Sequence, residues 1–405
     1  MTEDAQERLD TMALLAAADP ADMLRQVASS AAQVRTAVRI TLEADLDEII
    51  EAGRPRAIVI TGMGGSGVAG DVLGAVCGPG CRVQVVPVHD YQLPAWVGAA
   101  DLVIAVSCSG STEETISAAT EAVRRGSRLI GVGGERSPLA MIAQQARAPF
   151  IGVPSAGMPR STLWGLSMPL VVIASRLGLV EAGGDEYEAA AAELERVSHL
   201  CRPDSESFVN PAKSLALELS GTLPMIWGTS PLAGVAAYRF GCQLNENAKY
   251  PAVIGTLPEA NHNQVVTFDG PFSAGPGGFG GAGAGRARFG QTDFGEAGFG
   301  ETGFAEAGFG EEEPGGDRAG VSLRLVLLRD SVEHPQVARR REESARLAEE
   351  RGIGVTELAA AGGGPLQRLA SLVQLIDYAT VYLAVVLGID PGPVAAIQDL
   401  KARIA

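Results

Sequence analysis

From Arg56 onward the sequence alternates between short apolar runs and longer segments with helical spacing, and this alternation limits the possible folds more than any other feature. The first block has apolar runs at Ala57–Thr61, Val83–Val88, Leu102–Val106, Leu129–Val132 and Phe150–Val153, with helical segments from about Val68, at Glu113–Arg125 and at Leu163–Leu177. Strands separated by helices predict a parallel sheet that is covered by helices on both faces.

A second block of the same kind begins near Leu215. Its predicted strands are Leu223–Gly228, Val265–Asp269, Val321–Arg329 and Gly354–Leu358, and its predicted helices lie near Leu232–Asn247, Gln336–Arg351, Pro365–Leu387 and Val394–Ile404. Residues 1–50 have helical spacing, and residues 181–205 are typical of an interdomain helix and linker. The sequence therefore predicts a helical segment (1–50) followed by two α/β domains, at 51–185 and 206–405.

The segment 272–320 fits neither block, because it consists mostly of Gly, Ala, Glu and Phe. Its phenylalanines at 289, 294, 299, 304 and 309 recur every five residues, a period that matches neither helix nor strand. So much glycine makes ordering costly, and a few aromatic rings cannot offset that cost. We predict a disordered surface insertion, either a tolerated expansion or a weak aromatic self-association segment.

Composition excludes several classes of protein. The net charge is −16 and no basic run stands out, so nucleic acid is not an expected partner. We expect no signal peptide, since Met1–Asp22 is acidic, and no membrane span, since no run of about 18 uncharged apolar residues occurs. The five cysteines are scattered and the four histidines dispersed, which predicts a cytoplasmic protein with reduced thiols and no metal site.

The first predicted strand runs into a glycine loop, Gly62-Met63-Gly64-Gly65-Ser66-Gly67. Gly62, Gly64 and Gly67 satisfy the dinucleotide fingerprint, and Asp90 follows about 20 residues later. An NAD-binding domain is therefore one interpretation of the loop. Glycines after a first strand also serve any phosphate or sugar that needs close backbone approach, which leaves a sugar phosphate as the alternative.

Four hydroxyl side chains gather where the third predicted strand ends, in Ser107-Cys108-Ser109-Gly110-Ser111-Thr112. Hydroxyl groups and free backbone N–H groups at a helix N-terminus can bind a phosphate dianion without any cation. A single hydroxyl is enough to cap a helix, so four within six residues favour a phosphate site over a simple cap.

These two loops and three later motifs resemble a known family. GMGGSGVAGD (62–71) and SCSGSTEET (107–115) are similar to the sugar-binding and phosphate-binding loops of SIS (sugar isomerase) domains. QLNENAKYPA (243–252), LPEANHN (257–263) and DPGPVAAIQDLK (390–401) resemble the bifunctional phosphoglucose/phosphomannose isomerases of archaea and actinobacteria. The resemblance implies two flavodoxin-like SIS domains, a homodimer with active sites between its subunits, a sugar-phosphate substrate and no cofactor.

The resemblance also implies roles for particular residues. Ser107, Ser109 and Thr112 would hold the phosphate, and Gly64, Gly65 and Ser66 would lie along the sugar. Glu246 matches the general base, His262 the histidine that reaches the site from the partner subunit for ring opening, Lys401 the lysine that assists it, and Arg160 the arginine near the enediolate.

The chemistry is compatible with these assignments. Isomerisation moves one proton between C2 and C1 through a cis-enediolate, and a single carboxylate can act first as base and then as acid. Glu246 lies in a polar Asn-Glu-Asn cluster, and Glu259 is the rival carboxylate. A histidine that titrates near neutrality suits ring opening, and an arginine can oppose the charge that develops on the enediolate.

The function hypothesis is therefore a glucose-6-phosphate isomerase that also acts on mannose 6-phosphate. Relatives are thought to use a threonine in the C-terminal segment to accept mannose, whereas this chain has Gly392 and no threonine between Asp390 and Lys401. The alternatives are a non-catalytic sugar-phosphate sensor and an NAD-dependent oxidoreductase. The isomerase half of an amidotransferase is disfavoured, because Thr2 stands where a cysteine nucleophile would be needed.

Overall fold

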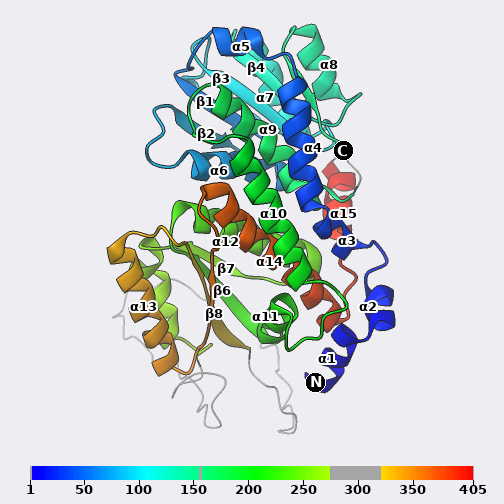
Figure 1. The fold of residues 1–405 in the computed structure, drawn as a ribbon, viewed down its shortest axis with the longest axis vertical. Coiled ribbons are helices and arrows are strands. Elements are labelled where there is room, and N and C mark those ends of the chain that lie inside the picture. Colours follow the sequence, from blue (N-terminus) through cyan, green and yellow to red (C-terminus); the bar gives the residue numbers. More distant parts are fainter. Residues whose placement is uncertain (1, 155–156, 274–320, 405) are drawn as a thin grey trace, which may run out of the picture.

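The structure is a computed structural model, and it describes residues 2–154, 157–273 and 321–404. Figure 1 shows one parallel sheet in the upper half of the molecule and a second in the lower half. The predicted fold class, two parallel-sheet α/β units behind an N-terminal helical segment, is confirmed. The predicted insertion at 272–320 lies almost entirely outside the described residues.

The first sheet has five parallel strands in the order β2-β1-β3-β4-β5. They are β1 (Ala57–Thr61), β2 (Gln84–Val88), β3 (Leu102–Ser107), β4 (Arg128–Gly133) and β5 (Phe150–Gly152). This is the flavodoxin-like strand order, which differs from the 3-2-1-4-5-6 order of dinucleotide-binding sheets. Its topological switch point lies between β1 and β3, so the glycine loop after β1 and the hydroxyl loop after β3 lie next to each other at the edge of the sheet where ligands of such folds bind.

The second sheet has four parallel strands in the order β7-β6-β8-β9, which repeats the order of the first four strands of the first sheet. The strands are β6 (Thr222–Gly228), β7 (Val253–Thr256), β8 (Ser322–Arg329) and β9 (Gly354–Ala359). The predicted strand at Val265–Asp269 was wrong, because these residues form a 3₁₀ helix, η4 (Gln264–Asp269). The short run Val253–Thr256 supplies the edge strand instead, pairing with Met225–Gly228 of β6.

Helices make up most of the remaining described chain. The N-terminal segment contains α1 (Thr2–Asp10), α2 (Met12–Ala18), α3 (Met23–Ala28), α4 (Ser30–Glu43) and α5 (Asp47–Glu51). The first sheet carries α6 (Gly65–Cys77), α7 (Glu113–Arg124), α8 (Pro138–Gln145), the 3₁₀ turn η1 (Pro159–Ser161) and α9 (Leu163–Arg176), and α10 (Gly184–Leu200) follows. The second sheet carries α11 (Pro211–Leu219), α12 (Pro231–Gln243), the π-helical turn η2 (Leu244–Ala248), η3 (Glu259–His262), α13 (Pro335–Glu350) and α14 (Pro365–Leu387), before α15 (Ala395–Ile404).

Several helices begin at a capping residue that is followed by proline. Asn210 Oδ1 accepts hydrogen bonds from the backbone N–H groups of Ala212 and Lys213, each at 3.1 Å, and Pro211 is the first residue of α11. Ser230 caps α12 in the same way, with Oγ 3.1 Å from the Ala233 nitrogen. Proline suits this position because its missing N–H would have no partner inside the helix.

One hydrophobic core joins the two sheets. Strand side chains that point to one face of the first sheet, such as Ile58 and Ile60, share this core with Ile226 and Val326 of the second sheet. Strand residues that alternate with these, such as Val59, point to the other face of the sheet and belong to a smaller cluster with residues of α7 and α8. The predicted interdomain helix, α10, runs along both halves in Figure 1 and packs against α4 and α14. The halves are therefore held together by burial as well as by the connecting chain.

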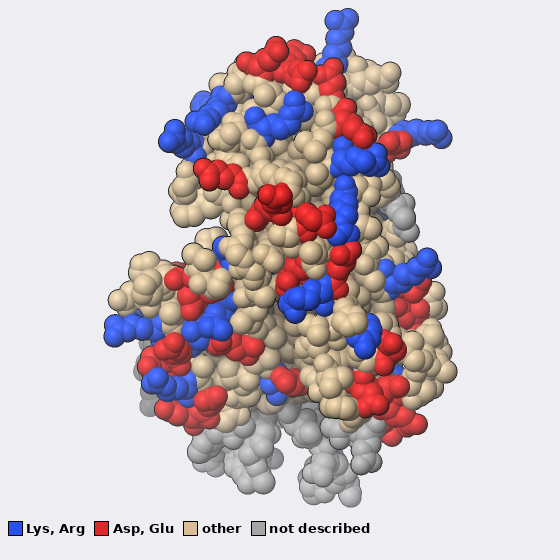
Figure 2. Space-filling view, viewed as in Figure 1, with Lys and Arg blue, Asp and Glu red and all other residues tan. Residues whose placement is uncertain are grey.

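The longest helix, α14, is apolar enough to cross a membrane by length and composition. In this structure 94% of its most apolar window is buried inside the protein. Such burial is typical of a core helix, and α14 packs against α10, α11 and α12. Figure 2 shows Asp, Glu, Lys and Arg side chains interspersed on the visible face, without a continuous basic patch over its described part.

Gly228, the last residue of β6, tests the tight turn from strand to helix in the second sheet. A Cβ at this position would collide with the backbone of Ala233 and Gly234 in α12. We expect Gly228→Ala to lower the free energy of unfolding by about 1–3 kcal/mol, measured by urea denaturation, because neither backbone can yield cheaply. Gly80→Ala is the control, since a Cβ there meets no atom within 4 Å. Equal stability of the two variants would contradict this account.

Candidate active site

The glycine loop that follows β1 lies against both the hydroxyl loop and Arg160. Gly64 has φ +54° and ψ −130°, a backbone conformation that favours glycine, and α6 begins at the next residue. A Cβ on Gly65 would lie 3.4 Å from the carbonyl oxygen of Pro159 and 3.5 Å from Cα of Arg160. Ser66 Oγ accepts a hydrogen bond of 3.1 Å from the backbone N–H of Cys108. The three residues predicted to lie along the sugar therefore separate the predicted phosphate loop from Arg160.

The hydroxyl loop has a defined internal geometry. Ser107 and Thr112 hydroxyls are hydrogen-bonded at 2.8 Å, and Ser109 Oγ accepts from the N–H (3.2 Å) and the hydroxyl (2.9 Å) of Ser111. Gly110 has φ +66°, and a Cβ there would collide with Ser137 Oγ. Thr112 precedes α7 without capping it through its side chain. First-turn N–H groups of α7 are thus left without that cap, as an anion site at a helix N-terminus requires.

Arg160 is buried in η1 and joins three parts of the chain. Its Nε donates to Asn247 Oδ1 at 2.7 Å, and one terminal nitrogen donates to the carbonyl oxygens of Pro391 and of Gly392, the latter at 2.8 Å. Its other terminal nitrogen, Nη1, lies 4.0 Å from Glu246 Oε2. That nitrogen makes no hydrogen bond to another described residue, so its N–H groups can donate to a bound ligand.

Glu246 lies in the π-helical turn η2, next to Asn247. A π turn inserts one extra residue into a helix and changes the direction of the side chains around it, and such turns are frequent at functional sites. Lys249, which ends the turn with φ +54°, donates to the carbonyl oxygens of Glu246 (2.9 Å) and Asp390 (3.1 Å). The carboxylate is therefore held in a fixed backbone frame that includes the C-terminal segment.

Burial and the partner's charge shift the pKa values of Glu246 and Arg160 in opposite directions. Burial raises the pKa of the Glu246 carboxyl above its usual range, and Arg160, Arg239 and Lys249 partly oppose this rise. Burial likewise lowers the pKa of Arg160, while Glu246 and Asp390 raise it. A carboxylate with a raised pKa beside a guanidinium is a typical acid–base pair of an active site.

Sequence reasoning missed a buried ion pair behind this site. Arg239 of α12 and Asp377 of α14 are 3% and 4% exposed, and their closest nitrogen and oxygen are 2.5 Å apart. Arg239 is the only charged residue of α12, and Asp377 is the only acidic residue of α14. An isolated charge of either sign in a mostly apolar helix was the signal that could have identified them.

Two of the predicted catalytic residues are not brought to the site within this chain. His262, at the end of η3, is exposed, and so is Lys401 in α15. Neither side chain makes a hydrogen bond or ion pair with another residue in the described ranges. Glu259, the rival carboxylate, is also exposed, and its Oε1 accepts from Asn263 Nδ2 at 3.2 Å. The chain thus brings together Arg160, Glu246 and the two loops, but not His262 or Lys401.

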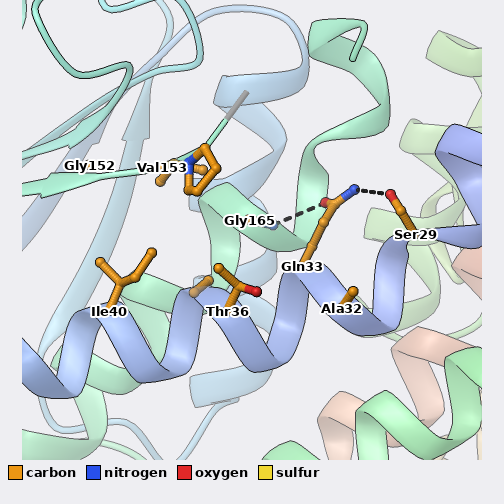
Figure 3. A pocket seen from close by; sticks show the side chains of 10 residues that line it. Ser29, Ala32, Gln33, Thr36, Ile40, Gly152, Val153 and Gly165 are labelled. Atoms are coloured by element: carbon orange, nitrogen blue, oxygen red, sulfur yellow. Dashed lines mark hydrogen bonds between the residues drawn. The ribbon is translucent and has the colours of Figure 1, made fainter. Parts of the chain in front are cut away.

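A separate apolar groove of about 180 Å³ lies between α4 and the end of β5. Figure 3 shows Gln33 between Ser29 and the backbone of Gly165, bonded to both. Gln33 Nε2 also donates to the carbonyl oxygen of Ser161 at 2.8 Å, so it supports the turn that carries Arg160. The groove has no charged lining residue and none of the predicted site residues, so it does not suit a phosphate. Among residues 2–154, 157–273 and 321–404, no group of three or more His, Cys, Asp or Glu side chains could hold a metal ion.

Comparison with known proteins identifies the family. Residues 208–404 match the family described as bacterial phospho-glucose isomerase C-terminal SIS domain. A bifunctional phosphoglucose/phosphomannose isomerase of Caldicellulosiruptor bescii is 31% identical over 350 residues, which cover 86% of this chain and 89% of the relative. The chain belongs to the bifunctional phosphoglucose/phosphomannose isomerase family.

A second member of the family and two solved structures are also similar to this chain. The bifunctional phosphoglucose/phosphomannose isomerase of Thermoplasma acidophilum is 27% identical and covers the same shares of both chains, 86% and 89%. A hypothetical protein from Thermus thermophilus has a TM-score of 0.67 at 15% identity, covering 99% of this chain and 94% of its own. The tagatose-6-phosphate ketose/aldose isomerase of Escherichia coli has a TM-score of 0.60 at 12% identity, with coverages of 96% and 94%. These two structures share the fold of this family member.

Thr112 tests the phosphate loop of this family member. Thr112→Val keeps the shape of the side chain but removes the hydroxyl that bonds to Ser107. We expect the dissociation constant for fructose 6-phosphate, measured by calorimetry, to rise about 10-fold or more, because a hydrogen bond to a charged group is worth about 1.5–3 kcal/mol. The control is Thr120→Val in the helix that follows, α7, where the lost hydroxyl bonds only to the carbonyl of Ile116. Unchanged affinity in Thr112→Val would move the phosphate elsewhere.

Proposed function

We propose that this protein is an aldose–ketose isomerase that interconverts glucose 6-phosphate, and also mannose 6-phosphate, with fructose 6-phosphate. The observation that carries the proposal is the pair formed by Glu246 and Arg160, with Glu246 Oε2 4.0 Å from a guanidinium nitrogen that has free N–H groups. Arg160 packs against Gly65, and Ser66 bonds to the hydroxyl loop, so the acid–base pair lies close to the loops predicted to bind the phosphosugar. The names of the relatives support the same reaction.

In the proposed mechanism the hydroxyl loop, Glu246 and Arg160 have separate roles. Ser107, Ser109, Thr112 and the N–H groups at the start of α7 hold the phosphate and so orient the open-chain sugar. Glu246 removes the proton from C2 of the aldose and returns it to C1, while the hydroxyl proton moves from O2 to O1, which yields the ketose. Arg160 donates from Nη1 to the oxygen that becomes negative in the enediolate. The raised pKa of Glu246 makes the carboxyl a stronger base than an ordinary glutamate.

Acceptance of mannose depends on space near C2, because the two aldoses differ only in the configuration of that carbon. Gly392 occupies the C-terminal segment, and its carbonyl oxygen accepts from Arg160 at 2.8 Å. A Cβ at Gly392 would lie 2.7 Å from Cβ of Ala21, so no larger residue fits there without movement of the N-terminal segment. Glycine adds no side chain beside the carbonyl oxygen that Arg160 binds, which is compatible with activity on both epimers.

We also propose a cytoplasmic homodimer in which His262 of one subunit completes the site of the other. The exposure of His262 and Lys401 supports this assembly, because ring opening needs groups that the single chain leaves outside the site. The helix α15, which carries Lys401, has no buried residue, and its apolar Ile397, Leu400 and Ile404 are 45%, 59% and 71% exposed. Free thiols at Cys77, Cys81, Cys201 and Cys242 are compatible with a reducing compartment.

The base is tested by Glu246→Gln, which keeps the size of the side chain but removes its charge. We expect turnover of fructose 6-phosphate to fall about 10²-fold or more, with phosphosugar affinity largely unchanged, since the carboxylate acts on the proton and the hydroxyl loop binds the phosphate. Glucose 6-phosphate and mannose 6-phosphate should both be quantified. Glu259→Gln is the matched control and should keep its turnover.

Near-normal turnover in Glu246→Gln would refute the assignment of the base. If the wild-type protein binds phosphosugar but converts none, the sensor hypothesis replaces the enzyme.

The shared site is tested by mixing two inactive variants. Co-refolding Glu246→Gln with His262→Ala in equal amounts should give roughly a quarter of wild-type turnover, because half of the dimers are mixed and one of their two sites is intact. Each variant refolded alone is the control. If both residues acted within one chain, mixing would restore no activity.

A further inference from the structure

The buried pair Arg239–Asp377 is part of a closed hydrogen-bonded ring that includes Arg160. Asp377 oxygens accept from Arg239 at 2.5 and 2.9 Å, and Arg239 donates in turn to the carbonyl oxygen of Arg160 at 3.0 Å. The Arg160 side chain donates to Asn247 at 2.7 Å, and Asn247 Nδ2 donates to the Thr380 hydroxyl at 3.0 Å. Thr380 donates to the carbonyl oxygen of Asp377 at 2.9 Å, which closes the ring.

This ring fixes Arg160 from two sides. One arm holds its backbone carbonyl in η1, and the other holds its guanidinium through Asn247, the residue next to Glu246. Both arms start from Asp377, one from the side chain and one from the backbone. A rigid frame of this kind sets the position of a catalytic group to within a fraction of an ångström, and such precision has large effects on rate.

The stability of the fold does not by itself explain why Arg239 and Asp377 are buried as a charged pair. Two charges taken out of water lose their hydration, and apolar residues of similar size often stabilise a fold as well or better. Gln243 adds a third donor to Asp377, at 3.2 Å. Burial raises the pKa of the Asp377 carboxyl, and Arg239 and Gln243 oppose this rise, so the negative charge of Asp377 depends on its pairing with Arg239. Burial of this pair therefore costs hydration free energy, and the pair contacts the candidate active site at the backbone of Arg160.

We infer that Arg239 and Asp377 are positioning residues that hold Arg160 in place and set the charge that Glu246 experiences. The inference rests on the proposed function, since it concerns the acid–base pair of that reaction. Neither residue needs to touch the substrate: Arg239 acts through the Arg160 backbone and through its own positive charge, and Asp377 acts through Arg239.

The charged surroundings of Glu246 determine the direction of each effect. The groups that face it are Arg160 from η1, Arg239 and Cys242 from α12, and Lys249 at the end of η2, with Asp390 interacting with Arg160 and Lys249. The three cations lower the pKa of Glu246 against the effect of burial. Loss of Arg239 should therefore raise this pKa further, and loss of the negative charge of Asp377 should lower it.

The test compares two variants that should shift the pH dependence of kcat/KM in opposite directions. In the wild type, kcat/KM falls with decreasing pH as Glu246 is protonated, because only the carboxylate can act as the base. Asp377→Asn should move this acid limb to lower pH by about half a unit or more. The double variant Arg239→Met/Asp377→Leu replaces the pair with apolar side chains. It should move the acid limb to higher pH, because Arg239 contacts Arg160 and its charge lowers the pKa of Glu246. It should also lower kcat about 10-fold or more. Thermal unfolding should show that the double variant remains folded.

Asp330→Asn is the matched control, because Asp330 forms a similar buried pair with Arg368 of the same helix, at 2.8 Å. It should change stability but leave the acid limb in place. If Asp377→Asn and the double variant shift the acid limb no more than this control, or shift it in the same direction, the inference is wrong.

Failure of the inference can be separated from failure of the proposed function. The pKa of Glu246 is also read by carbon NMR of protein labelled at glutamate carboxyls, with Glu246→Gln to assign its signal. If the wild type lacks isomerase activity, the proposed function fails, and opposite NMR shifts in the two variants still support the electrostatic role. If the wild type is active and those shifts are absent, only the inference fails.

Discussion

The guanidinium of Arg160 is the interaction on which the arrangement of the candidate site depends. It lies in a short turn of the first half of the chain, yet its partners come from η2 and from the segment that precedes α15. A buried guanidinium is costly unless it is paired, and here Nε and one terminal nitrogen are hydrogen-bonded while Nη1 lies beside Glu246. Satisfying Arg160 therefore fixes three distant parts of the chain relative to one another.

The two halves of the molecule divide the proposed work. The first sheet supplies the two loops that are proposed to bind the phosphosugar, since its switch point brings them together. The second sheet supplies the carboxylate through the π turn that follows α12. A single hydrophobic core joins the halves, so both loops and the carboxylate are supported by the same packed core.

Local features of the sequence were predictable because their causes are local. The glycine loop follows from backbone geometry that only glycine tolerates easily, and the hydroxyl loop from the chemistry of a helix N-terminus. The run Val265–Asp269 was assigned wrongly, because a short apolar run has no period that separates a strand from a helical turn. Glu246 could be proposed only through the resemblance of its motif to a family.

Long-range pairings were not predictable from the chain. Arg239 and Asp377 are 138 residues apart in sequence, and the sequence of neither helix indicates that the other helix is its partner. What the sequence did contain was an isolated arginine in one apolar helix and an isolated carboxylate in another, and such a charge must find a partner when its helix is buried. The same reasoning could not place His262 or Lys401, since exposed residues have no requirement for a partner within the chain.

The contact between Gly392 and Ala21 has a consequence for how the pocket could diverge. The two residues come from opposite ends of the chain, and a Cβ on Gly392 would lie 2.7 Å from that of Ala21. Enlarging position 392 alone would push the N-terminal segment away or displace the carbonyl oxygen of residue 392 that Arg160 uses. Glycine at position 21 would remove this contact, so related sequences with a larger residue at 392 should tend to have glycine at 21.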